Sequence, residues 1–186
     1  MLFRSARRLA AGRPGRFWYA DQYNHPANPR AHYLTTAEEL WRQTRGRITH
    51  LVAGLGTTGT LVGTGRRLKE LNPEIEVVAV QPDGPFHGLE GLKHLATTIV
   101  PGIYDPELPD RTEFVSTEDA EDAVRQLAKQ AGLLAGWSTG AALVAAERTL
   151  SNRPPVRPSD AFVVVIAPDS GARYLSEHRR LTGEAP

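Results

Sequence analysis

The sequence predicts an α/β fold, a three-layer structure in which a parallel sheet lies between flanking helices. Residues 48–53 form a β-branched apolar run that leads into glycine, as a buried parallel strand does before it turns into a helix. Residues 58–71 follow as a helix, and residues 75–80 as a second buried strand. A strand, a helix and a strand at this spacing indicate a parallel pair with a right-handed crossover.

The helix over residues 58–71 is amphipathic. Leu61, Val62 and Leu68 lie on one side of it, and Asn72-Pro73 ends it because the residue before a proline disfavours helical backbone angles. Residues 162–167, with the sequence FVVVIA, are predicted as a third buried strand.

Residues 116–132 are the clearest helix in the chain. Ser116 or Thr117 is the expected N-cap, acidic residues fill the first turns, and Gly132 ends the helix. The apolar residues keep the i, i+3, i+4, i+7 spacing of a helix that buries one face: Ala120, Ala123, Val124, Leu127, Ala128 and Ala131. We interpret this helix as scaffold.

Three other segments complete the predicted organisation. Residues 82–111 are rich in Gly and Pro and weak in periodicity, so we expect a long irregular excursion, which is often a functional segment. A second glycine turn at residues 135–142 leads into a helix over residues 139–150, with Ser138 as a candidate N-cap. The Pro-rich residues 151–160 are predicted as a surface connection.

Composition limits the classes of function. The chain has 186 residues, with 22 Lys and Arg against 21 Asp and Glu, so we expect one domain and neither nucleic acid nor a membrane as partner. A small-molecule substrate is expected instead. The sequence contains no Cys, which excludes a disulfide and a thiolate nucleophile and suits a reducing cytoplasm. It also contains no apolar run of the roughly 18 residues that a membrane span needs.

The first glycine turn, LVAGLGTTGT at residues 51–60, predicts a phosphate site. Glycines let the backbone approach a phosphate, and the free amides at the start of the next helix point toward it. The hydroxyls of Thr57, Thr58 and Thr60 add donors that suit a terminal phosphate monoester better than a bridging pyrophosphate. From this loop alone, an ordinary turn that binds nothing is the alternative.

The same turn matches the dinucleotide pattern G-x-G-x-x-G at Gly54, Gly56 and Gly59, so a Rossmann-type dinucleotide-binding module is a second alternative. That function needs an acidic residue at the end of the second strand to bind the ribose hydroxyls. The second strand here ends at Val80, and Asp83 follows only after a proline. This position weakens the dinucleotide alternative.

Two further sets of polar residues are assigned no catalytic or metal-binding role. Asp169 and Arg173, in PDSGARYLS, are interpreted as a structural pair near the C-terminus and not as an acid and a base. No metal site is expected, because no H-x-x-x-H or similar spacing occurs among the six histidines: His25, His32, His50, His87, His94 and His178.

Six ordered motifs resemble the cysteine synthase family, the O-acetylserine and O-phosphoserine sulfhydrylases. They are DQYNHPANPRAHYLTTAEELW, GLGTTGTLVGTGRRLKE, GPFHGLEGLKH, GIYDPELPD, GLLAGWSTGAAL and PDSGARYLS, and they span nearly all of residues 17–176. The resemblance implies the large domain of a fold-type II enzyme that uses pyridoxal 5'-phosphate and is usually a homodimer. The implied reaction is β-replacement on an activated serine by a sulfur nucleophile, with cystathionine β-synthase-like lyases in the same superfamily.

The resemblance also implies roles for individual residues. Ser138 is similar to the family's serine at the pyridine nitrogen, Gly91 lies in the segment that lines the cofactor face, and Gln22 resembles the glutamine that touches the substrate carboxylate. The loop that resembles the family's phosphate-binding loop consists of Gly56, Thr57, Thr58, Gly59 and Thr60.

Two positions depart from the family pattern. The family commonly has Gly where this chain has Thr58, although the GTTGT form resembles the branch that uses O-phosphoserine. A smaller apolar residue is usual at Trp137, which we expect either to narrow the site beside Ser138 or to pack outward.

The family's Schiff-base lysine has no counterpart in this sequence. Lys69 and Lys129 belong to polar parts of helices, and Lys93 does not match the family's lysine motif. The resemblance therefore covers only the C-terminal part of such an enzyme, no catalytic residue is assigned, and we expect the chain by itself to be inactive. A non-catalytic large-domain homologue is the third alternative.

The expected domain organisation follows from this resemblance. Residues 1–5 are interpreted as a sequencing artefact, and residues 6–23 as a remnant of the small domain's final helix and crossover. Residues 24–182 are interpreted as a partial cofactor-binding large domain, and residues 183–186 as a tail.

Overall fold

A four-stranded parallel sheet forms the centre of the molecule. The computed structural model describes residues 2–152 and 161–174, and its strands are β1 (His50–Gly54), β2 (Glu76–Pro82), β3 (Arg111–Val115) and β4 (Val163–Val165). Their order is β3-β2-β1-β4, and every neighbouring pair is parallel. The predicted parallel sheet is confirmed, whereas the predicted tail and nearly all of the Pro-rich connection lie outside the described residues.

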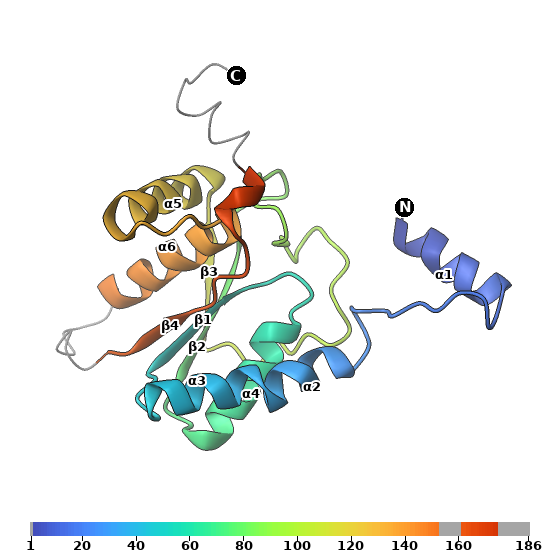
Figure 1. Cartoon of the computed structure of the whole chain (residues 1–186), viewed down its shortest axis with the longest axis horizontal. Coiled ribbons are helices and arrows are strands. Elements are labelled where there is room, and N and C mark those ends of the chain that lie inside the picture. Colours follow the sequence, from blue (N-terminus) through green and yellow to red (C-terminus); the bar gives the residue numbers. More distant parts are fainter. Residues whose placement is uncertain (1, 153–160, 175–186) are drawn as a thin grey trace, which may run out of the picture.

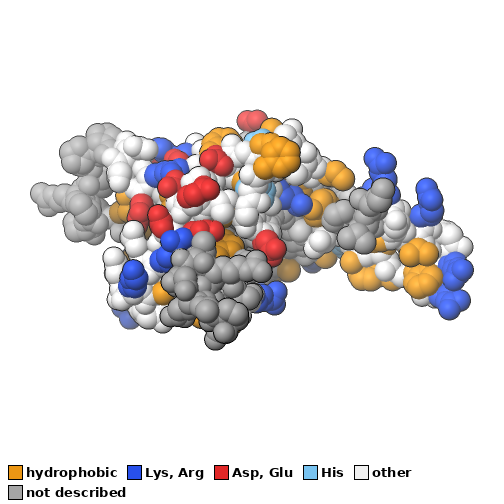
Figure 2. All heavy atoms as spheres, turned by 90° about the horizontal axis from the view of Figure 1, so that it is seen from above, with side chains coloured by type: hydrophobic (Ala, Val, Ile, Leu, Met, Phe, Trp, Pro, Cys, Tyr) orange, Lys and Arg blue, Asp and Glu red, His pale blue; other side chains and the backbone are white. Residues whose placement is uncertain are grey.

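Helices cover both faces of the sheet (Figure 1). One face carries α2 (Ala27–Leu34), α3 (Thr36–Thr44) and α4 (Gly59–Leu71), and the other carries α5 (Thr117–Ala131) and α6 (Trp137–Ser151). The short 3-10 helix η2 (Gly171–Tyr174) follows β4. Helix α1 (Leu2–Gly12) stands apart from this three-layer body, and its arginine side chains are visible in blue at the right of Figure 2.

The core has an apolar layer on each side of the sheet. Val52 and Val78 pack with Ala141 of α6 on one side, and Leu51 packs with Leu68 of α4 on the other. Successive side chains of a strand point to opposite faces, which is why Leu51 and Val52 belong to different layers. Burial on both faces explains why the strands read as continuous apolar runs in the sequence.

The predicted caps of α5 are confirmed. Ser116 is the N-cap, and its side chain accepts a hydrogen bond from the Asp119 backbone N–H at 3.1 Å. Gly132 ends the helix in the left-handed conformation, with φ of 68°. Ala120 and Val124 are the buried residues of its apolar face, which supports the interpretation of α5 as scaffold.

Two local features differ from the predictions. Strand β3 is missed by the sequence pattern because Arg111 and Glu113 interrupt its apolar run; it lies at the edge of the sheet, where charged residues are tolerated. Helix α6 begins at Trp137 with Gly136 as N-cap, so the prediction of Ser138 as the N-cap is wrong. Ser138 lies inside the first turn instead, and its backbone N–H finds its acceptor outside the helix.

Residues 83–110 contain no helix or strand, which confirms the predicted irregular excursion between β2 and β3. The excursion is nevertheless anchored, because Leu89 is fully buried and the Lys93 backbone N–H donates to the Leu55 carbonyl oxygen at 2.8 Å. Among the helices that the structure describes, none has the length and apolarity needed to cross a bilayer.

Candidate functional site

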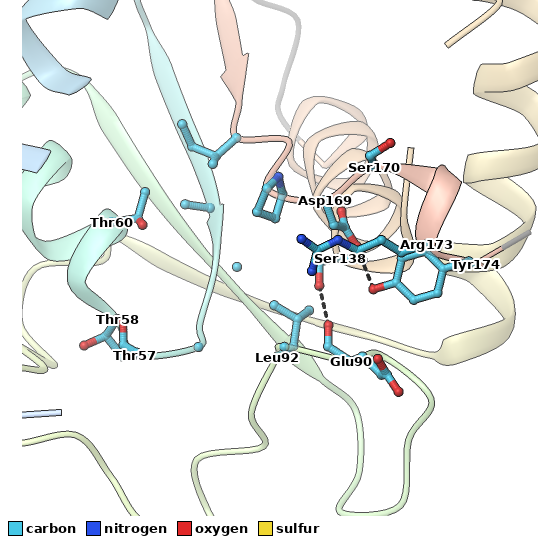
Figure 3. Close-up of a pocket in the computed structure, with 16 residues that line it drawn as sticks. Thr57, Thr58, Thr60, Glu90, Leu92, Ser138, Asp169, Ser170, Arg173 and Tyr174 are labelled. Carbon is cyan, nitrogen blue, oxygen red and sulfur yellow. Dashed lines mark hydrogen bonds between the residues drawn. The ribbon is translucent and has the colours of Figure 1, made fainter. Parts of the chain in front are cut away.

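A cleft of about 580 Å³ opens at the carboxyl ends of β1 and β4 (Figure 3). Strand β1 continues into α4 on one face of the sheet, whereas β4 follows α6 on the other. In parallel sheets, the point where neighbouring strands connect to opposite faces is the usual place for a ligand. Among the described residues, the polar ones that line the cleft are Thr57, Thr58, Thr60, Glu90, Ser138, Asp169, Ser170, Arg173 and Tyr174.

The turn after β1 presents free backbone donors to the cleft. The Leu55 N–H donates to the Val80 carbonyl oxygen at 2.8 Å and anchors the start of the turn to β2. The N–H groups of Gly56, Thr57 and Thr58, in contrast, have no acceptor among the described residues. They lie at the N-terminus of α4, where the helix dipole is positive, so this end of the cleft suits an anion.

Thr58 is held in a costly conformation. Its φ is 72°, a left-handed angle that β-branched residues rarely adopt. Its Oγ1 is buried and has no hydrogen-bond partner in the part of the chain that the structure describes. Costs of this kind concentrate at functional sites. A glycine would adopt the same backbone without strain, which is a physical reason for the Gly of the family pattern at this position.

Two threonine hydroxyls of the turn are positioned by α2. Thr57 Oγ1 accepts hydrogen bonds from Asn28 Nδ2 at 3.1 Å and from the Gly59 N–H at 3.4 Å. Thr60 Oγ1 lies 3.1 Å from Nε2 of His32. Because Thr57 accepts both of its bonds, its own proton is available to an anion in the cleft.

Two glycines of α4 permit the close packing of α2. A Cβ atom on Gly59 would overlap Oδ1 of Asn28, and one on Gly63 would overlap the carbonyl oxygen of Pro29. Gly59 is not among the described residues that line the cleft, unlike the other four residues of the predicted phosphate loop. Its position is set by contact with Asn28, which in turn holds Thr57.

Ser138 lies across the cleft from the threonines (Figure 3). Its Oγ donates to the carbonyl oxygen of Glu90 at 2.8 Å, and its backbone N–H donates to Oδ2 of Asp169 at 3.1 Å. Asp169 also accepts from the Thr139 backbone N–H at 3.1 Å and from the Thr139 hydroxyl at 2.6 Å. Asp169 thus caps α6 from the segment after β4 and fixes the position of Ser138.

Asp169 and Arg173 do not form the predicted pair. No ion pair joins them in the described residues, because the Asp169 carboxylate instead accepts from α6 and from the Tyr174 hydroxyl at 3.4 Å. Arg173 lines the cleft and is the only described Lys or Arg that does so. Burial raises the pKa of the Tyr174 phenol, as do the charges of Asp169 and Glu90, so this phenol remains a neutral donor.

The remaining predicted residues divide between the cleft and its surroundings. Gly91 lines the cleft with a φ of 89°, an angle that favours glycine. Gln22 is not among the described lining residues; it is exposed, and its backbone oxygen accepts from Asn28 Nδ2 at 2.7 Å. Trp137 is 2% exposed and packs on the Tyr174 ring at 5.4 Å between centroids, so it fills the core and does not narrow the cleft.

No lysine is among the described residues that line the cleft. Lys69 Nζ pairs with Asp110 at 2.7 Å, and Lys93 Nζ lies 5.2 Å from the centroid of the Tyr23 ring. Lys129 is in the last turn of α5. Within the described residues there is also no group of three or more His, Asp or Glu side chains placed to hold a metal ion.

Sequence reasoning missed Asn28 and His32, the α2 residues that contact the threonines of the turn. The sequence pattern presents His32 only as a possible metal ligand, although its spacing of four from Thr36 is a signal that the two side chains can meet. No local pattern connects Asn28 to Thr57, which lies 29 residues further along the chain. Only the packing of α2 on α4 brings these two together.

Known proteins match this chain over nearly its whole length. The family model described as pyridoxal-phosphate dependent enzyme matches residues 2–169. The cysteine synthase of Aquifex aeolicus is 50% identical over 170 residues, covering 91% of this chain and 52% of that protein. The cysteine synthase B of Escherichia coli is 41% identical, covering 84% of this chain and 50% of that protein.

Solved structures agree with the sequence matches. The crystal structure of cysteine synthase from Entamoeba histolytica superposes with a TM-score of 0.83 at 30% identity, covering 94% of this chain and 52% of that one. The chain therefore spans about half the length of the curated relatives it matches. The resemblance to the cysteine synthase family that the six motifs predict is confirmed.

Proposed function

This chain belongs to the pyridoxal-phosphate dependent enzyme family, and on that premise we propose that its cleft binds pyridoxal 5'-phosphate for β-replacement in cysteine biosynthesis. In the proposed reaction, a sulfur nucleophile replaces the acetate or phosphate group of O-acetylserine or O-phosphoserine. Because the chain spans about half the length of its relatives, its proposed share of this activity is to bind and orient the cofactor.

One observation carries this proposal: two complementary sets of donors border the same cleft. The free amides and the threonine hydroxyls after β1 suit a phosphate monoester, and Ser138 offers a neutral hydroxyl on the other side. The buried Thr58 Oγ1, which has no partner in the described residues, is a polar atom that a bound phosphate group would satisfy. The residues present therefore fit the cofactor.

Pyridoxal phosphate, when bound, supplies an electron sink for charge that develops on the substrate α-carbon. The proposed role of the turn after β1 is to hold the phosphate group, and that of Ser138 is to meet the pyridine nitrogen after releasing the Glu90 carbonyl. A neutral hydroxyl at that nitrogen, unlike a carboxylate, does not keep it protonated. This difference favours loss of a β-leaving group over transamination.

Two further residues have proposed roles beside the cofactor. Gly91 is proposed to lie against the cofactor face, where a side chain is absent and the backbone has a positive φ. Gln22 is proposed to contact the substrate carboxylate. Its backbone is tied through Asn28 to Thr57, so the start of α2 supports both the phosphate loop and this substrate residue.

Binding of pyridoxal phosphate and of pyridoxal, which lacks the phosphate, tests the cofactor proposal by equilibrium dialysis. Hydrogen bonds to a charged group contribute about 1.5–3 kcal/mol, so we expect at least a roughly tenfold preference for pyridoxal phosphate. Thr57→Val should reduce that preference. Ser138→Ala should lower the affinity for both compounds by the same factor, because both contain the ring nitrogen. Equal binding of the two compounds by the unmodified chain would contradict the phosphate assignment.

A threonine outside the cleft provides the matched control. Thr98 Oγ1 donates to the His94 carbonyl oxygen at 3.1 Å and is not among the described lining residues. Thr98→Val should leave both affinities unchanged. If Thr98→Val reduced the affinities as much as Thr57→Val does, the effect of Thr57→Val would be due to general destabilisation of the chain.

We further propose that this chain by itself holds the cofactor without a covalent bond and is inactive. The support is that no lysine is among the described lining residues. Borohydride reduction of the chain with one equivalent of pyridoxal phosphate, followed by peptide mapping of Lys69, Lys93 and Lys129, should show only weak labelling spread over these lysines. Stoichiometric labelling of Lys93, the lysine nearest the cleft in sequence, would disprove it.

The alternative of a non-catalytic homologue is distinguished by the DNA upstream of codon 6. An in-frame continuation that encodes a lysine motif would favour an enzyme, and its absence would favour the alternative.

The homodimer proposed for the complete enzyme is tested by sedimentation equilibrium.

O-phosphoserine is the preferred substrate candidate because of the GTTGT turn. Competition between O-phosphoserine and O-acetylserine for binding to the chain loaded with pyridoxal phosphate tests that choice.

A further inference from the structure

We propose that His32 is a positioning residue that directs the Thr60 hydroxyl proton into the cleft, an inference that rests on the proposed phosphate site. His32 lies on α2 and is not among the described lining residues, whereas Thr60 is. Its Nε2 lies 3.1 Å from Thr60 Oγ1, and its Nδ1 lies 3.0 Å from Thr36 Oγ1. These three side chains form a row that connects the start of α3 to the cleft.

The row has a direction because a neutral imidazole carries one N–H proton. With the proton on Nε2, His32 donates to Thr60 Oγ1, and the Thr60 proton is free to point into the cleft. With the proton on Nδ1, Thr60 donates to Nε2, and its proton points away from the cleft. The tautomer of His32 therefore decides whether Thr60 is a donor to a phosphate oxygen.

Thr36 completes the first arrangement. In the described residues its hydroxyl has no hydrogen-bond partner other than His32 Nδ1, whereas the adjacent Thr35 hydroxyl donates to the Ala31 carbonyl oxygen at 2.8 Å. The Thr36 proton is therefore available to Nδ1, and a phosphate oxygen that accepts the Thr60 proton selects the tautomer with the imidazole proton on Nε2. Burial lowers the pKa of His32 and keeps the ring neutral at neutral pH.

The packing of α2 on α4 keeps the row in place. A Cβ atom on Gly63 would lie 2.9 Å from the Cβ of His32, so the helices approach closely at this level. Thr60 and Gly63 are three residues apart on α4 and face the same side. The close packing of the two helix backbones at Gly63 therefore places the His32 side chain beside Thr60.

The first test measures the tautomer directly. In the chain labelled with ¹⁵N-histidine, the imidazole nitrogen shifts distinguish the two tautomers, and His32→Gln identifies the His32 signals by their loss. We expect the Nε2–H tautomer in the presence of inorganic phosphate, where a phosphate oxygen accepts the Thr60 proton. The Nδ1–H tautomer in the presence of phosphate would overturn the proposal.

The second test measures affinity for inorganic phosphate and for pyridoxal phosphate. Thr60→Val should weaken both by about 10- to 100-fold, because it removes a hydrogen bond to a charged group. His32→Leu should weaken both by roughly tenfold, and His32→Gln should recover part of the loss because its amide N–H can replace Nε2–H. A double variant of His32→Leu and Thr60→Val should bind no more weakly than Thr60→Val alone.

Adjacent threonines supply a matched pair of variants that do not touch the cleft. Thr36→Val should shift His32 toward the Nδ1–H tautomer and weaken phosphate binding by about 2- to 10-fold. Thr35→Val loses only the hydrogen bond from its hydroxyl to the Ala31 backbone carbonyl oxygen. It should change neither the His32 tautomer nor the affinity for phosphate. Equal effects of the two variants would contradict the proposal, and this pair decides the matter even if His32→Leu fails to fold.

The outcomes separate this inference from the proposed function. If the unmodified chain binds both compounds and a folded His32→Leu variant binds them equally well, His32 has no directing role and the cofactor site stands. If the unmodified chain binds neither compound, the proposed function fails and the directing role of His32 fails with it.

Discussion

The carboxylate of Asp169 accepts a hydrogen bond from the Ser138 backbone N–H at 3.1 Å, although the two residues lie 31 positions apart. That N–H belongs to the first turn of α6 and has no partner inside the helix. Asp169 therefore joins the segment after β4 to the helix that carries the proposed contact to the pyridine nitrogen. The stability of α6 and the position of Ser138 depend on the same carboxylate.

Asp169→Ala should lower the free energy of unfolding by about 1–2 kcal/mol, the usual cost of losing a helix N-cap. The variant leaves the N–H groups of Ser138 and Thr139 without their acceptor. Urea unfolding followed by circular dichroism measures the change. Asp122→Ala is the control, since Asp122 is 68% exposed and, within the described residues, its one ion pair is with Arg125 at 3.2 Å. Its effect should stay within about 0.5 kcal/mol.

Thr58→Gly should raise the free energy of unfolding by about 1 kcal/mol. Glycine removes the cost of a φ of 72° and also removes a buried hydroxyl that has no partner in the described residues. Thr58→Ala removes the hydroxyl but keeps the strained backbone, so urea unfolding should show a smaller gain for it. A Thr58→Gly variant less stable than the parent would show that this loop stores no strain.

Gly63→Ala should destabilise the chain by about 1–3 kcal/mol even though alanine is the better helix former, because overpacking outweighs propensity here. The added Cβ would overlap the Pro29 carbonyl oxygen and push α2 away from α4. Gly12→Ala in α1, where a Cβ meets nothing within 4 Å, should be neutral or slightly stabilising. Thermal unfolding of both variants compares the two sites.

Acid should weaken the fold partly through Asp110. Burial alone would raise the pKa of this carboxyl, but hydrogen bonds from Lys69 and the Val77 N–H outweigh it, and the pKa in the folded chain is lowered. A folded-state pKa below the unfolded one stabilises the fold at neutral pH, and this contribution is lost as the pH falls below about 4.

Asp110→Asn tests this linkage. The free energy of unfolding, measured by urea titration between about pH 5 and pH 3, should fall less steeply with acid for the variant than for the parent. Parallel curves for the two proteins would contradict a role of Asp110 in acid sensitivity. The variant itself should be less stable at neutral pH because the ion pair with Lys69, 2.7 Å long, is lost.

The sequence by itself determined the elements whose signals are local. Continuous apolar runs marked β1, β2 and β4 because burial on both faces leaves no polar alternation. Ser116 and Gly132 marked the ends of α5 because capping depends on a few adjacent residues. The ordered motifs also determined the family, since they carry both spacing and residue type.

Only the tertiary structure decided what non-local packing controls. The edge strand β3, with Arg111 paired to Glu76 at 3.2 Å, depends on a partner strand and not on its own pattern. The first-turn N–H groups of α6 donate to Asp169, and not to a side chain of the helix's own N-terminus, because the segment after β4 returns to that helix. His32 reached Thr60 because two helices approach at Gly63. Such contacts join residues far apart in the chain, and no local spacing encodes them.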